Sequence, residues 1–263
     1  MSTPDLAAYV GGYEQMFGHY EALCARLDGD QLAVQSLCPE WDVRGVLAHV
    51  VGVERALDGW APSTESPPPF GEVGVFAREI AGLEPAALAE HVGAVTRSRL
   101  AHLRSLDPSV VEAPSFTPTG LATYGRFLQI RLFDMWVHAR DIAVPLGERL
   151  DDGGFVAGKA LDEITLGAGY IVGKKIGLPD GMSIVFRLGG GAARDIAVRV
   201  DGRAAVVDGV DHPDVEVLTD VTTFVLLAAG RVDPQEQIDR GRISWRGDAT
   251  WGERAARNLA YTM

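Results

Sequence analysis

Apolar side chains in the first 150 residues recur every three to four positions, as expected for helices that bury one face. This spacing predicts a series of long helices: residues 6–27, a second helix capped by Asp42, residues 73–106 and residues 121–144. Two segments rich in proline, 61–71 and 107–119, interrupt the pattern, because proline removes a backbone donor and clashes with the preceding turn. Four amphipathic helices of this length predict a four-helix bundle over residues 1–150.

The hydrophobic pattern changes after residue 150. A helix-like stretch comes first, and short runs of alternating apolar and polar residues follow, which is typical of strands. The helix-like stretches are 154–176, 220–229 and 249–261, and the strand-like runs are 183–188, 195–200, 204–207, 215–218 and 243–245. Three glycines at 189–191 are followed by no helix, so they predict a hairpin loop rather than a phosphate-binding loop. Residues 151–263 therefore predict a small α+β domain, and the whole chain predicts an α+β two-domain fold.

The charge balance argues against two classes of partner. Asp and Glu number 36 against 24 Lys and Arg, which gives a net charge of −12 and a pI near 4.9. Nucleic acids and membrane surfaces both attract basic proteins, so neither partner is expected. The first five residues lack the basic and apolar segments of a signal peptide, and the chain has only two cysteines. These features predict a reduced, cytoplasmic protein.

Two of the six histidines lie inside apolar helical segments. His49 belongs to the second predicted helix and His138 to the fourth, where Asp134 precedes it by one helical turn. Residues at this spacing share a helix face, so Asp134 and His138 can bind one metal ion, and His49 from a facing helix would leave a coordination site open. The alternative is an ordinary hydrogen bond between Asp134 and His138 with His49 in the core. The spacing alone favours this alternative.

The remaining titratable residues predict structural roles. His91 and His102 share the third predicted helix with several arginines, Arg99 among them, and this mixture predicts a solvated face. Cys24 lies on the apolar stripe of the first helix and predicts a core residue. Cys38 precedes the second helix beside proline, with no base or cation next to it in the sequence, so a structural role is favoured over a reactive one.

Arginine is much more frequent than lysine in this chain, a preference that follows GC-rich codons and predicts a GC-rich bacterial source. In the C-terminal segment, Arg231, Arg242 and Arg246 are candidates to bind a carboxylate, because a guanidinium can donate two parallel hydrogen bonds to it. A solvated surface is the alternative for each of them.

Two segments resemble a known family. Residues 37–50 read Leu-Cys-Pro-Glu-Trp-Asp-Val-Arg-Gly-Val-Leu-Ala-His-Val, and residues 133–142 read Phe-Asp-Met-Trp-Val-His-Ala-Arg-Asp-Ile. They are similar to the metal-binding segments of the mycothiol-dependent maleylpyruvate isomerase family. Residues 224–231 and 243–248 look like the C-terminal half of that family.

The resemblance implies a DinB-like metal-binding bundle over residues 1–150 and a sterol-carrier-like α+β domain over residues 151–263. It implies a divalent metal held by His49, Asp134 and His138, with zinc expected and nickel as the alternative. It also implies mycothiol as the thiol cosubstrate and an actinobacterial source. The sequence departs from the pattern in one respect: Asp134 stands where the characterised isomerase pattern has Glu. Its shorter side chain puts the site geometry and the metal preference in question.

The function implied is that of a metal-dependent enzyme. The metal would activate a low-molecular-weight thiol for isomerisation of, or S-transfer to, a small electrophilic substrate. We expect one of Arg231, Arg242 and Arg246 to bind the substrate carboxylate, and the chain to act as a monomer or a homodimer. Two alternatives of another class stay open. One is a protein that binds a lipid or another hydrophobic ligand, and the other is a regulatory protein built on the same scaffold.

Overall fold

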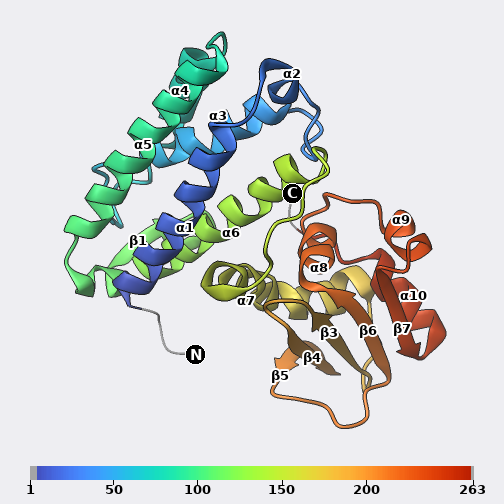
Figure 1. The fold of residues 1–263 in the computed structure, drawn as a ribbon. Coiled ribbons are helices and arrows are strands. Elements are labelled where there is room, and N and C mark those ends of the chain that lie inside the picture. The colour runs from blue at the N-terminus through green and yellow to red at the C-terminus, as the bar shows by residue number, and fades with distance from the viewer. Residues whose placement is uncertain (1–4, 262–263) are drawn as a thin grey trace. The chain divides into compact units, whose positions relative to one another are not determined.

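The computed structural model describes residues 5–261, so most of the segment considered as a signal peptide, residues 1–4, lies outside the description, as do residues 262–263. The chain forms two compact units, Met1–Leu150 and Asp151–Met263 (Figure 1). The first unit is mainly helical, and the second combines one sheet with helices, which confirms the predicted α+β two-domain fold class. Among the described residues, no helix is both long enough and apolar enough to cross a membrane.

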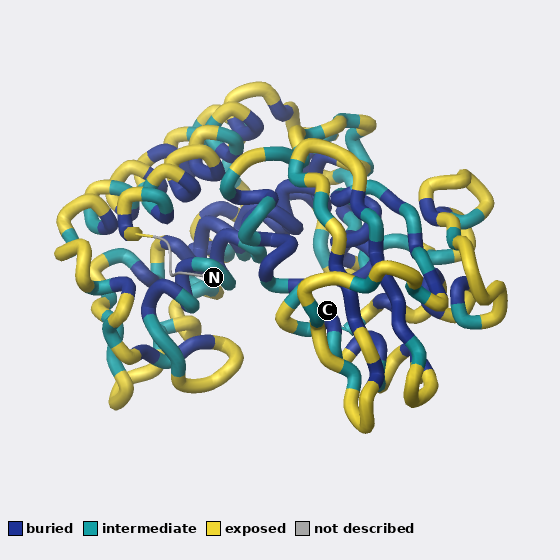
Figure 2. The backbone as a smooth tube through the Cα atoms, turned by 90° about the horizontal axis from the view of Figure 1, so that it is seen from below, coloured by how far each residue is buried: buried dark blue, intermediate teal, exposed yellow. Residues whose placement is uncertain are grey.

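Four long helices form the N-terminal unit: α1 (Leu6–Cys24), α3 (Val43–Ala56), α5 (Pro85–Ser105) and α6 (Tyr124–Ala143). Helices α1 and α3 each pack against both α5 and α6, which makes the predicted bundle. Buried and exposed residues alternate along α1 and α5, as expected for amphipathic helices, whereas α6 has no exposed residue and so lies inside the unit (Figure 2). The buried residues of α3 include Val43, Val46, Leu47 and Val50, which follow the predicted recurrence of apolar residues every three to four positions.

The predicted helix over residues 73–106 is wrong as a single element. Helix α4 (Val73–Ile80) ends first, and α5 begins separately with Pro85 in its first turn. Proline is tolerated in the first turn because the backbone N–H there has no partner within the helix, whereas inside a helix it breaks the hydrogen bonding. The apolar period continues across the break, which is why the pattern alone did not reveal it.

The proline-rich segment 107–119, which by its composition predicts an irregular loop, in fact has regular structure. It contains a 3₁₀ turn (Pro108–Glu112) and strand β1 (Pro114–Thr117), which pairs antiparallel with β2 (Gly120–Thr123). Helix α6 therefore starts at Tyr124, after the N-cap Thr123, rather than at residue 121. A short helix α2 (Gly29–Leu32) and a 3₁₀ turn (Phe70–Glu72) complete the unit.

Asp42 caps helix α3, as predicted. Its Oδ1 accepts a hydrogen bond from the backbone N–H of Gly45 at 2.7 Å. This bond fixes the start of the helix that carries His49, and it satisfies one of the N–H groups that the first turn leaves unpaired.

Asp42→Ala is expected to lower the free energy of unfolding by about 1 kcal/mol, because the capped N–H loses its acceptor. Asp42→Asn keeps an acceptor oxygen and is the matched control, expected to stay close to wild type. Denaturant unfolding of the two variants measures the difference. Equal losses in both would show that the capping bond does not stabilise α3.

The C-terminal unit is built on one sheet with the strand order β5-β4-β3-β6-β7. Its strands are β3 (Ser183–Gly189), β4 (Arg194–Asp201), β5 (Arg203–Val207), β6 (Val215–Asp220) and β7 (Ile243–Gly247). Strands β3 and β6 run parallel and the other neighbours are antiparallel. All five predicted strands are present, and the glycines at 189–191 lie in the turn between β3 and β4, as predicted.

Helices of the C-terminal unit pack against this sheet. They are α7 (Gly154–Tyr170), continued by a wider π-helical turn (Ile171–Ile176), α8 (Val221–Ala228), α9 (Pro234–Asp239) and α10 (Ala249–Arg257). Helix α7 contacts β4 and β5, whereas α10 contacts β6 and β7. The short helix α9 was not predicted, because six residues are too few to show a helical period.

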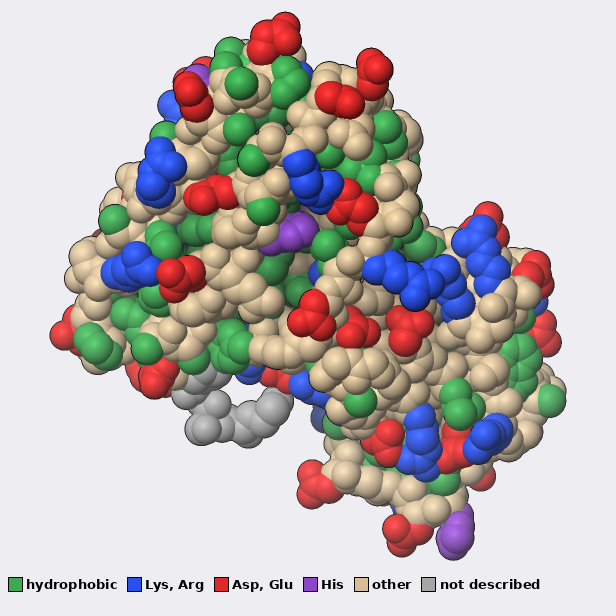
Figure 3. All heavy atoms as spheres, in the orientation of Figure 1, with side chains coloured by type: hydrophobic (Ala, Val, Ile, Leu, Met, Phe, Trp, Pro, Cys, Tyr) green, Lys and Arg blue, Asp and Glu red, His purple; other side chains and the backbone are tan. Residues whose placement is uncertain are grey.

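Acidic and basic side chains are interspersed over the face shown in Figure 3. Pairs such as Arg26–Glu148 and Arg55–Glu79 join opposite charges at the surface. Mixed charges of this kind give local ion pairs rather than one strong field. The expected absence of a nucleic-acid partner stays a prediction.

Candidate metal centre

Helices α3 and α6 bring three candidate ligands together in the N-terminal unit. Asp134 and His138 lie one turn apart on α6, and His49 faces them from α3. The Oδ2 atom of Asp134 is 3.7 Å from His49 Nε2, and its Oδ1 atom is 3.5 Å from His138 Nε2. One nitrogen or oxygen from each of the three side chains lies within 4.8 Å of the others. The three residues selected from the sequence thus converge on one point.

The distances in this group fit a small divalent cation. Both nitrogen–oxygen distances are longer than the roughly 2.7–3.2 Å of a good hydrogen bond. Ligands placed about 2.0–2.2 Å from a tetrahedral zinc ion lie about 3.3–3.6 Å apart, close to the separations seen here. The side chains of His49 and Asp134 are 28% and 27% exposed, so solvent reaches the group. Two imidazoles and one carboxylate with an accessible side match the donor set of a catalytic zinc site.

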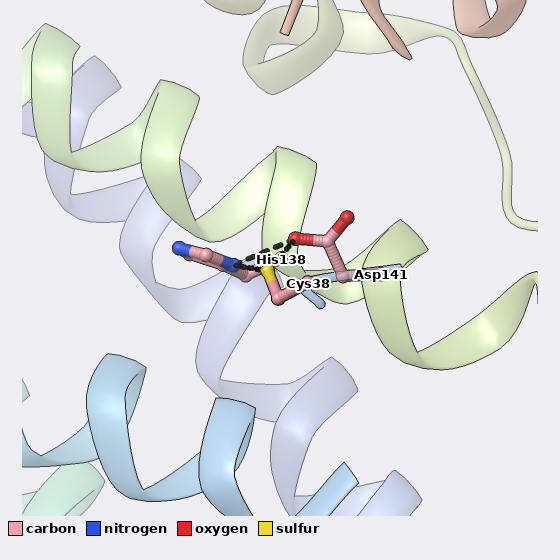
Figure 4. Close-up of side chains that lie close together, drawn as sticks. All are labelled: Cys38, His138 and Asp141. Atoms are coloured by element: carbon pink, nitrogen blue, oxygen red, sulfur yellow. Dashed lines mark hydrogen bonds and ion pairs between the residues drawn. The ribbon is translucent and has the colours of Figure 1, made fainter. Parts of the chain in front are cut away.

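Asp141 fixes the orientation of His138. Its Oδ2 atom accepts a hydrogen bond from Nδ1–H of His138 at 2.8 Å, and the thiol of Cys38 donates to the same oxygen at 3.1 Å (Figure 4). All three side chains are buried. With the proton on Nδ1, Nε2 is the ring nitrogen left to face Asp134, as a metal-binding imidazole requires.

The surrounding charges shift the pKa of two of the three candidate ligands. Burial by itself raises the pKa of Asp134, but Arg131 and His138 hold it well below its usual value. Burial lowers the pKa of His138, but Asp134 and the hydrogen bonds to Asp141 and Cys38 hold it well above its usual value. Without a cation, the carboxylate is ionised and the imidazole takes up a proton. A cation bound at Nε2 therefore competes with that proton.

The segment that precedes α3 also supports the candidate ligands, through contacts with His49 and with α6. The ring of Trp41 stacks on His49 with centroids 4.9 Å apart and an interplanar angle of 28°. The backbone N–H of Leu37 donates to the carbonyl oxygen of Asp141 at 3.0 Å, which ties the segment to α6. These contacts give a physical role to the proline- and tryptophan-containing segment that marks the start of α3 in the sequence.

A chain of buried ion pairs reaches Asp134 from inside the bundle. Arg131 donates through Nη1 to Asp134 at 2.7 Å and through Nε to Glu54 at 2.9 Å. The other oxygen of Glu54 accepts from Nε of Arg99 at 3.2 Å. Glu54 and Arg99 are 1% and 0% exposed, so the predicted solvated face is wrong for Arg99. It points inward because Glu54 and the carbonyl oxygen of Leu57 accept its hydrogen bonds.

Three of these supporting residues were missed by sequence reasoning: Glu54, Arg131 and Asp141. Arg131 precedes Asp134 by three residues, and Asp141 follows His138 by three, so each pair shares one face of α6. This spacing was a usable signal for both. For Glu54 the sequence carries no comparable signal, because its partners come from two other helices.

Other candidate residues are structural or peripheral. His91 is exposed, as predicted, whereas His102 is half-buried and accepts a hydrogen bond from the N–H of Gly59 at 2.8 Å. Both cysteines are free thiols. Burial raises the pKa of Cys24 to about 12, so its thiol stays protonated at neutral pH and acts as the core residue predicted.

The three arginines proposed for substrate binding belong to the C-terminal unit. Arg231 follows α8 and is half-buried, and its Nη1 donates to the carbonyl oxygen of Ala229 at 3.1 Å. Arg242 and Arg246 are exposed, the latter within β7. Their role in binding a carboxylate stays a prediction.

Comparison with known proteins finds relatives of the N-terminal unit. A family model described as the mycothiol maleylpyruvate isomerase N-terminal domain matches residues 14–143, which contain His49, Asp134 and His138. Uncharacterized proteins from two strains of Mycobacterium tuberculosis are 29% identical over 132 residues. That match covers 50% of this chain and 64% of the length of those relatives.

Two crystal structures share the two-domain fold. One is the mycothiol-dependent maleylpyruvate isomerase, with a TM-score of 0.59 and 19% identity over 88% of this chain and 93% of that chain. The other is a mutant of this enzyme in which alanine replaces a histidine, with a TM-score of 0.62 and 18% identity over 95% and 98% of the two chains. Residues 14–143 are thus similar to the mycothiol maleylpyruvate isomerase N-terminal domain, the family that the resemblance in the sequence predicted.

Proposed function

We propose that this protein is a metal-dependent enzyme that uses mycothiol to act on a small electrophilic substrate. The group formed by His49, Asp134 and His138 carries the proposal, because its donors, spacing and exposure suit a divalent cation with an open position. The family of the N-terminal unit supports mycothiol as the thiol and isomerisation as the reaction.

His49, Asp134 and His138 would hold the cation, with zinc expected and nickel as the alternative. When bound, the cation favours the thiolate form of a thiol and so supplies a nucleophile at neutral pH. Asp141 keeps the proton of His138 on Nδ1, which leaves Nε2 as the donor. Trp41 orients the ring of His49 by stacking on it. These contacts hold the donors in place before the thiol arrives, which limits the reorganisation that binding requires.

Isomerisation needs only the thiolate and a conjugated substrate. The sulfur forms a bond to one carbon of a cis double bond, and the π electrons move onto the conjugated carbonyl oxygen. After rotation about the new single bond, the carbon–sulfur bond breaks and its electron pair returns to sulfur as the trans double bond forms. The thiol is regenerated, and nothing is oxidised or reduced. In S-transfer, the second candidate reaction, the carbon–sulfur bond persists and the leaving group departs with its electron pair.

Further parts of the proposal concern the rest of the chain. One of Arg231, Arg242 and Arg246 binds the substrate carboxylate, since a guanidinium matches that group. The protein works in the cytoplasm, as a monomer or a homodimer, without a nucleic-acid or membrane partner.

A reconstitution assay tests the proposed reaction. Chelator-treated protein, with or without added zinc, is mixed with mycothiol and maleylpyruvate, and the loss of the cis isomer is followed. Turnover is expected only when zinc and mycothiol are both present. A panel of epoxides and halides, scored by the formation of mycothiol adducts, separates S-transfer from isomerisation. Turnover that persists without thiol or without metal would contradict the proposal, as would zinc-loaded protein that is inactive on every substrate.

A further inference from the structure

We propose that Arg131 is a positioning residue that occupies one oxygen of Asp134, so that the carboxylate offers a single oxygen to a bound cation. This inference rests on the proposed function, because it concerns a cation held by His49, Asp134 and His138. Its consequence is a four-coordinate site, in which Asp134 contributes one donor and an incoming thiol takes the open position.

The two oxygens of Asp134 have different surroundings. Oδ2 lies 3.7 Å from Nε2 of His49, and it accepts a hydrogen bond from Nη1 of Arg131 at 2.7 Å, a distance typical of a strong charge-assisted bond. Oδ1 lies 3.5 Å from Nε2 of His138, outside hydrogen-bond distance. Arg131 thus bonds to Oδ2 and leaves Oδ1 to the cation. An unrestrained carboxylate binds metals through one or both oxygens.

The guanidinium of Arg131 is fixed by a partner other than Asp134. Its Nε donates to Glu54 at 2.9 Å, and its side chain is only 5% exposed. Nη2 has no hydrogen-bond partner among the described residues. The guanidinium thus makes one bond to each carboxylate, and the forked contact that would occupy both oxygens of Asp134 is not formed.

The balance of buried charge ties Arg131 to Asp134 rather than to Glu54. Arg99 is fully buried and pairs with Glu54, so the charge of Glu54 is already neutralised. The charge of Arg131, the other arginine in this chain of ion pairs, is then balanced by Asp134. A buried ion pair is weak evidence of stabilisation, because desolvation offsets the attraction. A role in orienting the carboxylate explains why a second arginine lies in this part of the core.

Cobalt substitution tests the proposal without measuring catalysis. Chelator-treated protein is loaded with one equivalent of Co²⁺, and its visible spectrum reports the coordination number. Wild type is expected to show the strong bands of four-coordinate cobalt. In Arg131→Met, the freed carboxylate binds through both oxygens, and absorbance per cobalt falls about twofold or more, because higher coordination weakens these bands. Arg131→Lys can donate one hydrogen bond to Oδ2 and is expected to restore the wild-type spectrum.

Arg55→Met is the matched control, since Arg55 lies on α3 and pairs with the exposed Glu79. Its spectrum should equal that of wild type. If Arg131→Met does not fold, the double variant Glu54→Gln, Arg131→Met replaces it, because it removes one buried charge of each sign. The cobalt spectrum of the double variant should show the same weakened bands. A wild-type spectrum in the folded variant, whatever its stability, overturns the proposal for Arg131 alone. Wild-type protein that binds no cobalt and no zinc overturns the proposed function itself.

Discussion

Replacing Glu54 with alanine is expected to lower the free energy of unfolding by about 3–5 kcal/mol, because it leaves buried charges without a partner. Glu54 is 1% exposed, and each of its carboxylate oxygens accepts a hydrogen bond from a different arginine. These arginines come from α5 and α6, whereas Glu54 lies on α3. The single carboxylate therefore links three helices of the bundle, and its loss weakens all of these contacts together.

Denaturant unfolding of Glu54→Ala and of Glu79→Ala makes the comparison. Glu79 is an exposed partner of Arg55 on the neighbouring helix α4, and surface ion pairs contribute little to stability. Little change is expected in that control. Similar small losses in both variants would show that the buried chain of ion pairs does not support the fold.

The second large effect is expected on metal binding. His138→Ala should weaken the affinity for zinc more than about 100-fold, since it removes a ligand, whereas loss of a supporting partner typically costs about 10–100-fold. In Asp141→Asn, the loss of zinc affinity should be about 10–100-fold, because Nδ1 of His138 keeps a hydrogen-bond partner but loses the charge that orients it. Competition with a chromophoric chelator measures both affinities.

His102→Ala is the control for this series. His102 is another half-buried histidine of the bundle, and its ring accepts a hydrogen bond from Gly59 and is absent from the candidate ligand group. Its zinc affinity should equal that of wild type. Equal affinities in His138→Ala and His102→Ala would mean that zinc binds elsewhere on the protein.

Local signals in the sequence predicted much of the fold. The apolar period of α3 and the cap at Asp42 place His49 correctly on its helix, and the alternation of residues 183–207 predicts three neighbouring strands. The spacing of Asp134 and His138 also shows that both share one face of α6. These features depend on residues close together in the chain, which is why one sequence suffices to reveal them.

Features that depend on pairing across the chain were not predicted. The β1–β2 hairpin begins at Pro114 and has Pro118 in its turn, and the three prolines within residues 107–119 by themselves indicate a loop. Arg99 follows polar neighbours on a long helix, and its burial depends on Glu54, which is 45 positions away. The hydrogen bond from Cys38 to Asp141 spans 103 positions. A single sequence carries no record of such contacts, because each partner alone has the character of an ordinary surface or loop residue.

Elemental analysis of the purified protein tests the metal centre most directly. We predict about one zinc or nickel ion per chain in the wild type, and none in the double variant His49→Ala, His138→Ala. A folded wild-type protein that contains no metal, and that binds none when zinc is added, would contradict a metal-dependent function.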